Sequence, residues 1–154
     1  MSDSLLIRQD EDGICTLTLN RPSAYNSLSL ELMQSLIETF EELSSDTSIR
    51  TVIIRGGGKG FCAGHDLKQM LGVGTEDYYQ ETFETCSIMM QAVQRLPIPV
   101  IAQVHGVATA AGCQLVASCD LAVAASTSRF ATPGVNIGLF CSTPMVALSR
   151  TVAP

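Results

Sequence analysis

The residues best suited to chemistry lie in two glycine-rich segments, GGGKGFCAGHDLK at residues 56–68 and GVATAAGCQLVASCD at residues 106–120. The first offers backbone N–H groups and small residues that let a ligand approach the main chain closely. The second sets an amide, Gln114, among small and apolar residues, where it is costly unless it is hydrogen-bonded. If one N–H group from each segment pointed at a single oxygen atom, the pair would form an oxyanion hole. The spacing alone does not show that the two segments converge.

Three other interpretations of the first segment stay open on the residues alone. A phosphate-binding P-loop needs Ser or Thr directly after Gly-Lys, and here Gly60 and Phe61 follow the lysine. Gly58, Gly60 and Ala63 fit the G-x-G-x-x-A pattern of dinucleotide sites, but the acid at the required spacing, Asp77, lies in a helical pattern. The third interpretation is a strand-to-helix turn that binds nothing.

Charge narrows the range of partners. The formal net charge is −6, so the chain lacks the basic surface that nucleic acids and anionic membranes require, and we expect neither partner. The two lysines of the chain, Lys59 and Lys68, both lie within the first glycine-rich segment, where they could hold a small polyanion. No metal site is predicted. None of the cysteines forms a Cys-x-x-Cys pair, and we expect them to be reduced and mostly buried: Cys15, Cys62, Cys86, Cys113, Cys119 and Cys141.

The amino-terminal residues MSDSLLIRQDED contain acids and no long apolar core, so neither a secretory signal nor an arginine-rich transit peptide is visible. The apolar region that begins at Pro97 is interrupted by polar residues before it reaches the roughly 18 to 20 residues of a membrane span. We therefore expect a soluble protein with a cytoplasmic location.

The elements that must position the two segments alternate between strand and helix. Alternating apolar and polar residues on either side of Asp12-Gly13 predict a β-hairpin of residues 4–9 and 14–19. Apolar residues at helical spacing predict helices over residues 29–43, with Ser29 as the N-cap, 75–94 and 110–118. Short apolar runs predict strands over residues 51–55, 100–104 and 121–125. This order is typical of parallel βαβ units and predicts an α/β protein.

Two further features concern the second half of the chain. Between residues 97 and 138 the charged residues are Asp120 and Arg129, which predicts a segment buried on nearly every side. We expect Asp120 to be a structural turn acid. The segment from Met145 to Pro154 predicts a further helix that ends with the chain. We therefore expect one domain, residues 1–154, that is a fragment of a longer fold or depends on a partner subunit.

Four stretches resemble the enoyl-CoA hydratase/isomerase (crotonase) superfamily. They are NRPSAYNSLS from Asn20, GKGFCAGHDLKQM from Gly58, PVIAQVHGVATAAGCQLVASCDLAVA from Pro99 and FATPGVNIGLF from Phe130. They follow the family's order and match about its first three fifths. The resemblance implies an α/β, crotonase-like fold of repeated ββα units with the carboxy-terminal helical part missing.

The resemblance also implies roles for individual residues. The N–H groups of His65 and Ala111 would polarise a thioester carbonyl, and these two residues with Gln114 form the expected catalytic set. The positions that match the coenzyme A site are Ser23, Ala24, Ala63, Leu67 and Lys68. Coenzyme A would be part of the substrate, an acyl-CoA or enoyl-CoA, and no prosthetic group is implied. A full-length form would be a homotrimer or hexamer in fatty acid metabolism. We expect the His65 side chain to face solvent.

Two departures from the family affect the expected activity. Hydratases of this family carry glutamates at the positions of Gln114 and Gly134, and losing one positioned acid or base costs about 10² to 10⁴ in rate. The sequence is most similar to a subgroup that shares both substitutions. Three hypotheses remain: a hydratase/isomerase-type lyase or isomerase of weak activity, an acyl-CoA decarboxylase that needs only enolate stabilisation, and a non-catalytic acyl-CoA binder or truncated remnant.

Overall fold

The computed structural model describes residues 4–153, and its main feature is a five-stranded sheet in the order β1-β2-β3-β4-β6. The first pair, β1 and β2, is an antiparallel hairpin, and each later neighbour pairs in parallel. The strands are β1 (Leu6–Glu11), β2 (Ile14–Leu19), β3 (Thr51–Gly56), β4 (Val100–Val104) and β6 (Leu121–Ala124). Because β3 and β4 are parallel neighbours, the loops that follow them leave the same edge of the sheet.

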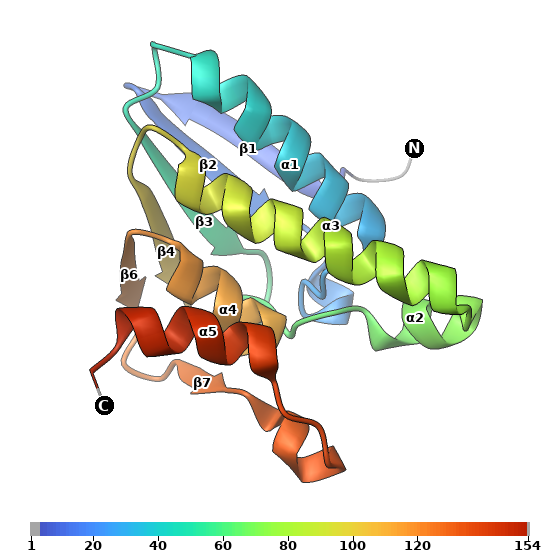
Figure 1. Cartoon of the computed structure of the whole chain (residues 1–154). Coiled ribbons are helices and arrows are strands. Elements are labelled where there is room, and N and C mark those ends of the chain that lie inside the picture. The colour runs from blue at the N-terminus through green and yellow to red at the C-terminus, as the bar shows by residue number, and fades with distance from the viewer. Residues whose placement is uncertain (1–3, 154) are drawn as a thin grey trace.

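Helices cover one face of this sheet (Figure 1). The long helices α1 (Leu30–Ser45) and α3 (Glu76–Arg95) run side by side over it, and the short helix α2 (Leu67–Val73) precedes α3. Each inward face supplies buried apolar side chains, such as Leu36 and Phe40 of α1 and Met89 of α3, to a core that also includes Leu17 and Ile54 of the sheet. The apolar stripes of these helices are therefore buried against the sheet, as the helical spacing predicted.

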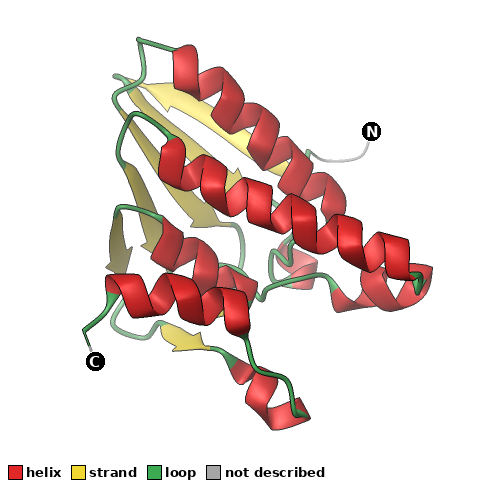
Figure 2. Ribbon diagram, viewed as in Figure 1, coloured by secondary structure: helices red, strands yellow, loops and turns green. Residues whose placement is uncertain are grey.

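The remaining elements lie beside the five-stranded sheet and the helices α1 and α3 (Figure 2). They include the two-stranded parallel sheet of β5 (Val107–Thr109) and β7 (Arg129–Ala131), and the helices α4 (Ala111–Ser118) and α5 (Ser142–Thr151), which pack against each other. Two 3-10 turns, η1 (Pro22–Ala24) and η2 (Pro133–Ile137), complete the chain. Two consecutive strands followed by a helix recur as β1β2α1, β4β5α4 and β6β7α5. The predicted ββα repeat is therefore present.

The local signals explain most element boundaries. Asp12 and Gly13 have φ of 51° and 81°, the left-handed geometry that a tight hairpin needs. Ser29 caps α1 by accepting a hydrogen bond from the Leu32 N–H at 3.3 Å. Thr75 caps α3 in the same way, accepting from the N–H of Tyr78 at 3.3 Å. The sequence did not predict α2, β5 or β7, which have seven, three and three residues and are too short for a periodic pattern to be recognised.

The prediction that residues 97–138 are buried on nearly every side is wrong for their second half. Helix α4 is buried almost throughout and β4 is buried at Val100, Ala102 and Val104, whereas β6 and β7 are exposed along their whole length. Val123 is 65% exposed and Ile137 is 79% exposed. An apolar composition indicates that a segment is suited to burial, but it does not show which other element covers that segment. All six cysteines are free thiols, five of them buried and Cys141 partly so.

Neither a membrane-spanning helix nor a cluster of metal-ligating side chains is present within residues 4–153. No helix within residues 4–153 is both long enough and apolar enough to cross a membrane. Over the same range, no group of three or more His, Cys, Asp or Glu residues is arranged to hold a metal ion.

Candidate functional site

The two glycine-rich segments meet at the edge of the sheet. The N–H groups of Phe61 and Cys62 both donate to the Val107 carbonyl, at 3.0 and 3.1 Å, and the Thr109 N–H donates to the Cys62 carbonyl at 3.0 Å. The Thr109 hydroxyl adds a hydrogen bond to the Ala63 carbonyl at 3.1 Å. The segment that follows β3 is therefore held against β5 over several residues, a convergence that spacing alone did not establish.

Two glycines make this contact possible. A Cβ atom on Gly64 would lie 3.0 Å from the Ala110 Cβ and 3.3 Å from the Ala111 backbone nitrogen, and Gly64 has a φ of 94°. A Cβ atom on Gly112 would overlap the Cys62 carbonyl oxygen. Side chains at these two positions would push the segments apart, so glycine is needed for close approach of backbone to backbone.

The convergence brings two N–H groups close together. Among the described residues, neither the N–H of His65 nor that of Ala111 donates a hydrogen bond to a protein acceptor. Ala111 is the first residue of α4, so its N–H is one of the unpaired donors at a helix start, where the helix dipole is positive. Ala110, before it, has φ 51° and ψ −122°, a strained backbone conformation for alanine. It is held there because its N–H donates to the Ala131 carbonyl at 2.9 Å.

Gln114 lies one turn further along α4. Its side chain is buried, with the residue only 8% exposed, and its Oε1 atom has no hydrogen-bond partner among the described residues. An amide has no proton that titrates near pH 7, so Gln114 can bind a polar group and cannot act as an ordinary acid or base.

The side chain of His65 does not face solvent, contrary to the prediction. Its ring packs edge-on against Phe83 of α3, with 5.3 Å between ring centroids and 85° between planes. Its Nε2 atom is buried and has no partner among residues 4–153. Burial lowers the pKa of His65, because a charged imidazole loses its hydration there. The ring is therefore mostly neutral near pH 7.

The residues predicted to bind coenzyme A come from two segments that the structure joins. Ser23 and Ala24 belong to the turn η1, and Leu67 and Lys68 form the exposed start of α2. The Ala63 N–H donates to the carbonyl of Tyr25, just after η1, at 3.0 Å.

A largely buried ion pair, Arg21–Asp66 at 2.6 Å, links the same two segments, and Asp66 also accepts from the Gln69 N–H at 3.1 Å as the N-cap of α2. Burial, the largest single effect, would raise the pKa of Asp66, but the hydrogen bond and charge of Arg21, together with the backbone N–H groups of Gln69 and Lys68, outweigh it and lower that pKa. The five predicted coenzyme A residues therefore share one rim of the molecule.

Other predicted residues have structural roles. One carboxylate oxygen of Asp120 accepts from the N–H of Val100 at 2.8 Å, at the start of β4 and away from the segments that follow the strands. Its prediction as a turn acid is confirmed. Asp77 lies in the first turn of α3 and not at a strand end, which removes the main support for a dinucleotide site. Lys59 is exposed, and Gly134 lies in η2, where a Cβ atom would come 2.7 Å from the Leu139 carbonyl oxygen.

Sequence reasoning missed two features of the site. Phe83, which orients His65, gave no signal, because one aromatic residue in an amphipathic helix is ordinarily core. The strained backbone of Ala110 also gave no signal. A positive φ favours glycine, and the sequence has alanine at this position.

A family comparison agrees with the fold and with the two segments. The family model described as enoyl-CoA hydratase/isomerase matches residues 9–153. The chain belongs to this family. The crystal structure of an enoyl-CoA hydratase from Mycobacterium smegmatis superposes with a TM-score of 0.94 and 56% sequence identity, covering 99% of this chain and 60% of that one. This match confirms the predicted crotonase-like α/β fold.

Among relatives of known name, the enoyl-CoA hydratase domain-containing protein 3 subgroup is similar over most of the chain. The Xenopus laevis protein is 53% identical over 148 residues, which are 96% of this chain and 50% of that protein. The Homo sapiens protein is 50% identical over 141 residues, which are 92% of this chain and 46% of that protein. A 2,3-dehydroadipyl-CoA hydratase of Escherichia coli is 35% identical over 139 residues, which are 90% of this chain and 52% of that protein. The chain spans about half the length of the curated relatives it matches.

The predicted cytoplasmic location is wrong. The relatives from Xenopus laevis and Homo sapiens are both named mitochondrial proteins, which points away from the cytoplasm. A targeting segment lies outside the folded domain and adds nothing to its core, so the composition of the domain carries no information about it.

Proposed function

We propose that this chain binds the thioester of an acyl-CoA, with the carbonyl oxygen between the N–H groups of His65 and Ala111. The observation that carries the proposal is the convergence of the two glycine-rich segments, with two donors that have no protein acceptor in the described part of the chain. Paired donors of this kind stabilise the negative charge that develops on the oxygen when an enolate forms. The N-terminus of α4 adds its dipole to the same field.

The coenzyme A moiety would lie along the rim formed by Ser23, Ala24, Ala63, Leu67 and Lys68. Support comes from the exposure of Leu67 and Lys68 beside the turn η1 and from the hydrogen bond between Ala63 and Tyr25 that joins the two segments. Lys68 is free to meet a phosphate group, because within residues 4–153 it forms no ion pair. A trimer or hexamer belongs to the same proposal, and sedimentation of the purified chain tests it.

The reaction class we propose is that of an enoyl-CoA hydratase or isomerase with limited activity. The family supports the class, and relatives in it include both a 2,3-dehydroadipyl-CoA hydratase and a 1,2-epoxyphenylacetyl-CoA isomerase, each from Escherichia coli. We expect the activity to be limited because neither Gln114 nor Gly134 has a side chain that transfers a proton near pH 7. Removing a positioned acid or base costs about 10² to 10⁴ in rate.

A second candidate is decarboxylation of a malonyl-type thioester. The observation that favours it is that Gln114 and the neutral His65, beside the two N–H groups, carry no charge. Loss of carbon dioxide leaves its bonding electron pair on the α-carbon, and the resulting enolate needs the two donors but no base. Turnover of crotonyl-CoA compared with malonyl-CoA separates the two candidates.

Calorimetry with two ligands tests the proposed thioester site. Butyryl-CoA and its thioether analogue S-butyl-CoA differ in the carbonyl oxygen, and each hydrogen bond to that oxygen is worth roughly a factor of 2 to 10 in affinity. We expect the thioester to bind about tenfold more tightly. Equal affinities would contradict the pair of donors, and binding of neither ligand would contradict acyl-CoA binding altogether.

Two matched variants test the coenzyme A rim. Lys68→Ala should weaken binding of both ligands several-fold, and added salt should reduce the difference, because an exposed charge contact with phosphate is screened. Lys59→Ala removes an equally exposed lysine from the same segment and should leave both affinities unchanged. The reverse result would place the phosphates beside Lys59.

A further inference from the structure

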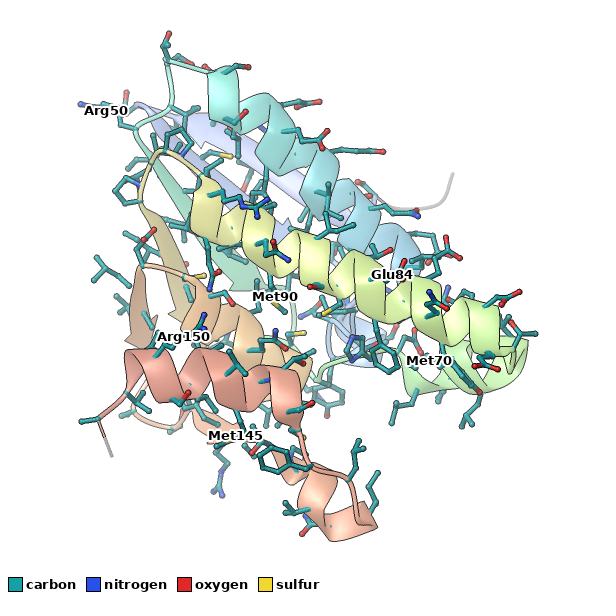
Figure 3. All side chains as sticks on the ribbon, viewed as in Figure 1. Arg50, Met70, Glu84, Met90, Met145 and Arg150 are labelled. Atoms are coloured by element: carbon teal, nitrogen blue, oxygen red, sulfur yellow. The ribbon has the colours of Figure 1, made fainter. Side chains whose placement is uncertain are left out.

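The five-stranded sheet has an open face on the side away from the helices. In β3, Val52 and Ile54 are fully buried in the core beneath the helices, which also contains Met90 of α3 (Figure 3). Ile53 and Arg55 alternate with them along the strand and are only half-buried. Strands β2 and β4 show the same alternation. Sheets of parallel strands ordinarily have both faces covered, so an open face in the described chain is a place where a ligand could bind.

A row of side chains crosses this open face near the carboxyl ends of the strands. Arg55 of β3 lies in register with Thr18 of β2 on one side and with Gln103 of β4 on the other. Gln103 lies in turn in register with Val123 of β6. Neighbouring strands are about 5 Å apart, so these four side chains form one continuous surface. Together with His105, which follows β4, they line a cavity of about 550 Å³, a volume typical of small-molecule sites.

Arg55 supplies the cavity with a positive charge that has no acidic partner. Its Nε atom donates to the Thr18 hydroxyl at 2.9 Å and its Nη2 atom donates to the Gln9 carboxamide oxygen at 3.4 Å, and both acceptors are uncharged. Within residues 4–153 it forms no ion pair. A guanidinium has five N–H groups, so some of them remain available for a ligand. Their planar arrangement suits a carboxylate, which arginine binds through two parallel hydrogen bonds.

The acids of the neighbouring strand leave this charge uncompensated. Asp10 and Glu11 of β1 line a second hollow that the Arg55 side chain also borders. Asp10 is already paired with Arg8 at 2.8 Å. Glu11 lies in register with the first residue of β2, which is four residues and about 13 Å along the strand from Thr18. The residues that line the cavity itself include no acid, so the cavity favours a ligand with one negative charge.

The other side of the cavity is apolar. It is formed by Val123, which is 65% exposed, and by Ala124 and Ala125. A purely ionic ligand such as phosphate would leave this wall in contact with water, whereas a hydrocarbon group would cover it. Strand β4 lies between β3 and β6, so a ligand that reaches from Arg55 to this wall spans about 10 Å. That span favours a carboxylate with a chain of several carbons.

We propose that this cavity binds a small organic carboxylate, with the carboxylate group on Arg55 and the hydrocarbon part against the β6 wall. Gln103, which is exposed between the two, offers an amide N–H to the same carboxylate. The site is separate from the proposed acyl-CoA site, because none of the residues assigned there to the thioester or to coenzyme A lines the cavity. The two proposals therefore fail or stand independently.

NMR titration of the isotope-labelled chain with three probes tests the proposal. Hexanoate has both the charge and the hydrocarbon chain, hexanamide has the chain without the charge, and inorganic phosphate has charge without a chain. We expect hexanoate to shift the backbone amide signals of Arg55 and Gln103 saturably, and the other two probes to bind about tenfold more weakly. Equal affinity for hexanamide, or tighter binding of phosphate, would overturn the proposal. Hexanoate shifts confined to the surroundings of His65 and Ala111, or no binding at all, would also overturn it.

Four variants then assign the binding to Arg55. Arg55→Met removes the charge and keeps an unbranched side chain, and Gln103→Glu places a competing carboxylate in register with Arg55. Each should weaken hexanoate binding about tenfold. Arg50→Met removes an arginine just before β3 (Figure 3) that donates to the Asp12 carbonyl at 2.8 Å, and Gln94→Glu adds the same charge at an exposed position of α3. Both controls should leave the affinity unchanged. Unchanged affinity in Arg55→Met or Gln103→Glu, with a native circular dichroism spectrum, would contradict the assignment.

Discussion

Replacing Gln114 by methionine should make the unliganded protein more stable. The residue is only 8% exposed and its Oε1 atom has no partner among the described residues, so folding strips water from that atom without replacing it. Such an unpaired group costs about 1 to 3 kcal/mol, and methionine fills a similar volume without it. We expect the free energy of unfolding to rise by about 1 to 2 kcal/mol. For a chain of this size the melting temperature should rise by about 2 to 8 °C.

A second glutamine provides the control. Gln69 uses both ends of its amide: its Oε1 accepts from the Leu30 N–H at 3.2 Å, and its Nε2 donates to both Glu31 carboxylate oxygens at 2.9 Å. Gln69→Met should therefore lower the melting temperature, by an amount equivalent to about 1 kcal/mol. Thermal denaturation followed by circular dichroism measures both variants. A lower melting temperature for Gln114→Met would refute the reasoning, because it would mean that the folded protein already satisfies the carboxamide.

Three other predictions concern stability. Gly112→Ala should cost about 2 to 3 kcal/mol, measured by urea denaturation, because its Cβ has no space, whereas Gly72→Ala, with nothing within 4 Å of its Cβ, should be neutral or stabilising. Asp120→Ala should cost about 1 kcal/mol and leave acyl-CoA affinity unchanged; a lost affinity would contradict its structural role. Asp66 has a folded pKa below its ordinary 3.8, so its pairing with Arg21 stabilises the fold above that pH and less as pH falls below it. Asp66→Asn should therefore flatten the acid side of the curve of stability against pH.

Much of the fold follows from short-range sequence signals. The apolar spacing of α1 and α3 is long enough to identify both helices, and Ser29 and Thr75 place their starts because a side-chain oxygen there satisfies an unpaired N–H. Strand β4 is bounded as predicted, at Val100 and Val104. The short strands β5 and β7 escaped prediction because they form by pairing with each other across the chain, next to a tertiary hydrogen bond from the Ala110 N–H to the Ala131 carbonyl, and α2, with seven residues, is too short for a periodic pattern to be recognised.

The site was predictable in part. The two glycine-rich segments could be recognised from residue types, but their convergence depends on the parallel pairing of β3 with β4 and on backbone contacts between Cys62 and Thr109. The orientation of the His65 ring depends on Phe83, a residue of a different helix. Residue types and spacing therefore identify what could do chemistry, while side-chain direction requires the packing of elements far apart in the sequence.

Several local violations of ordinary folding rules lie at the proposed site. Ala110 has a left-handed φ of 51°, the N–H groups of His65 and Ala111 lack acceptors in the described structure, and Gln114 is buried unpaired. Each feature costs stability in the empty protein, and the close-packed core of α1, α3 and the sheet offsets that cost. A ligand that accepts from the two N–H groups and pairs with the amide would recover part of it as binding free energy. Binding should therefore raise the melting temperature more for butyryl-CoA than for its thioether analogue S-butyl-CoA at equal ligand concentration, because the stabilisation grows with the ratio of ligand concentration to dissociation constant.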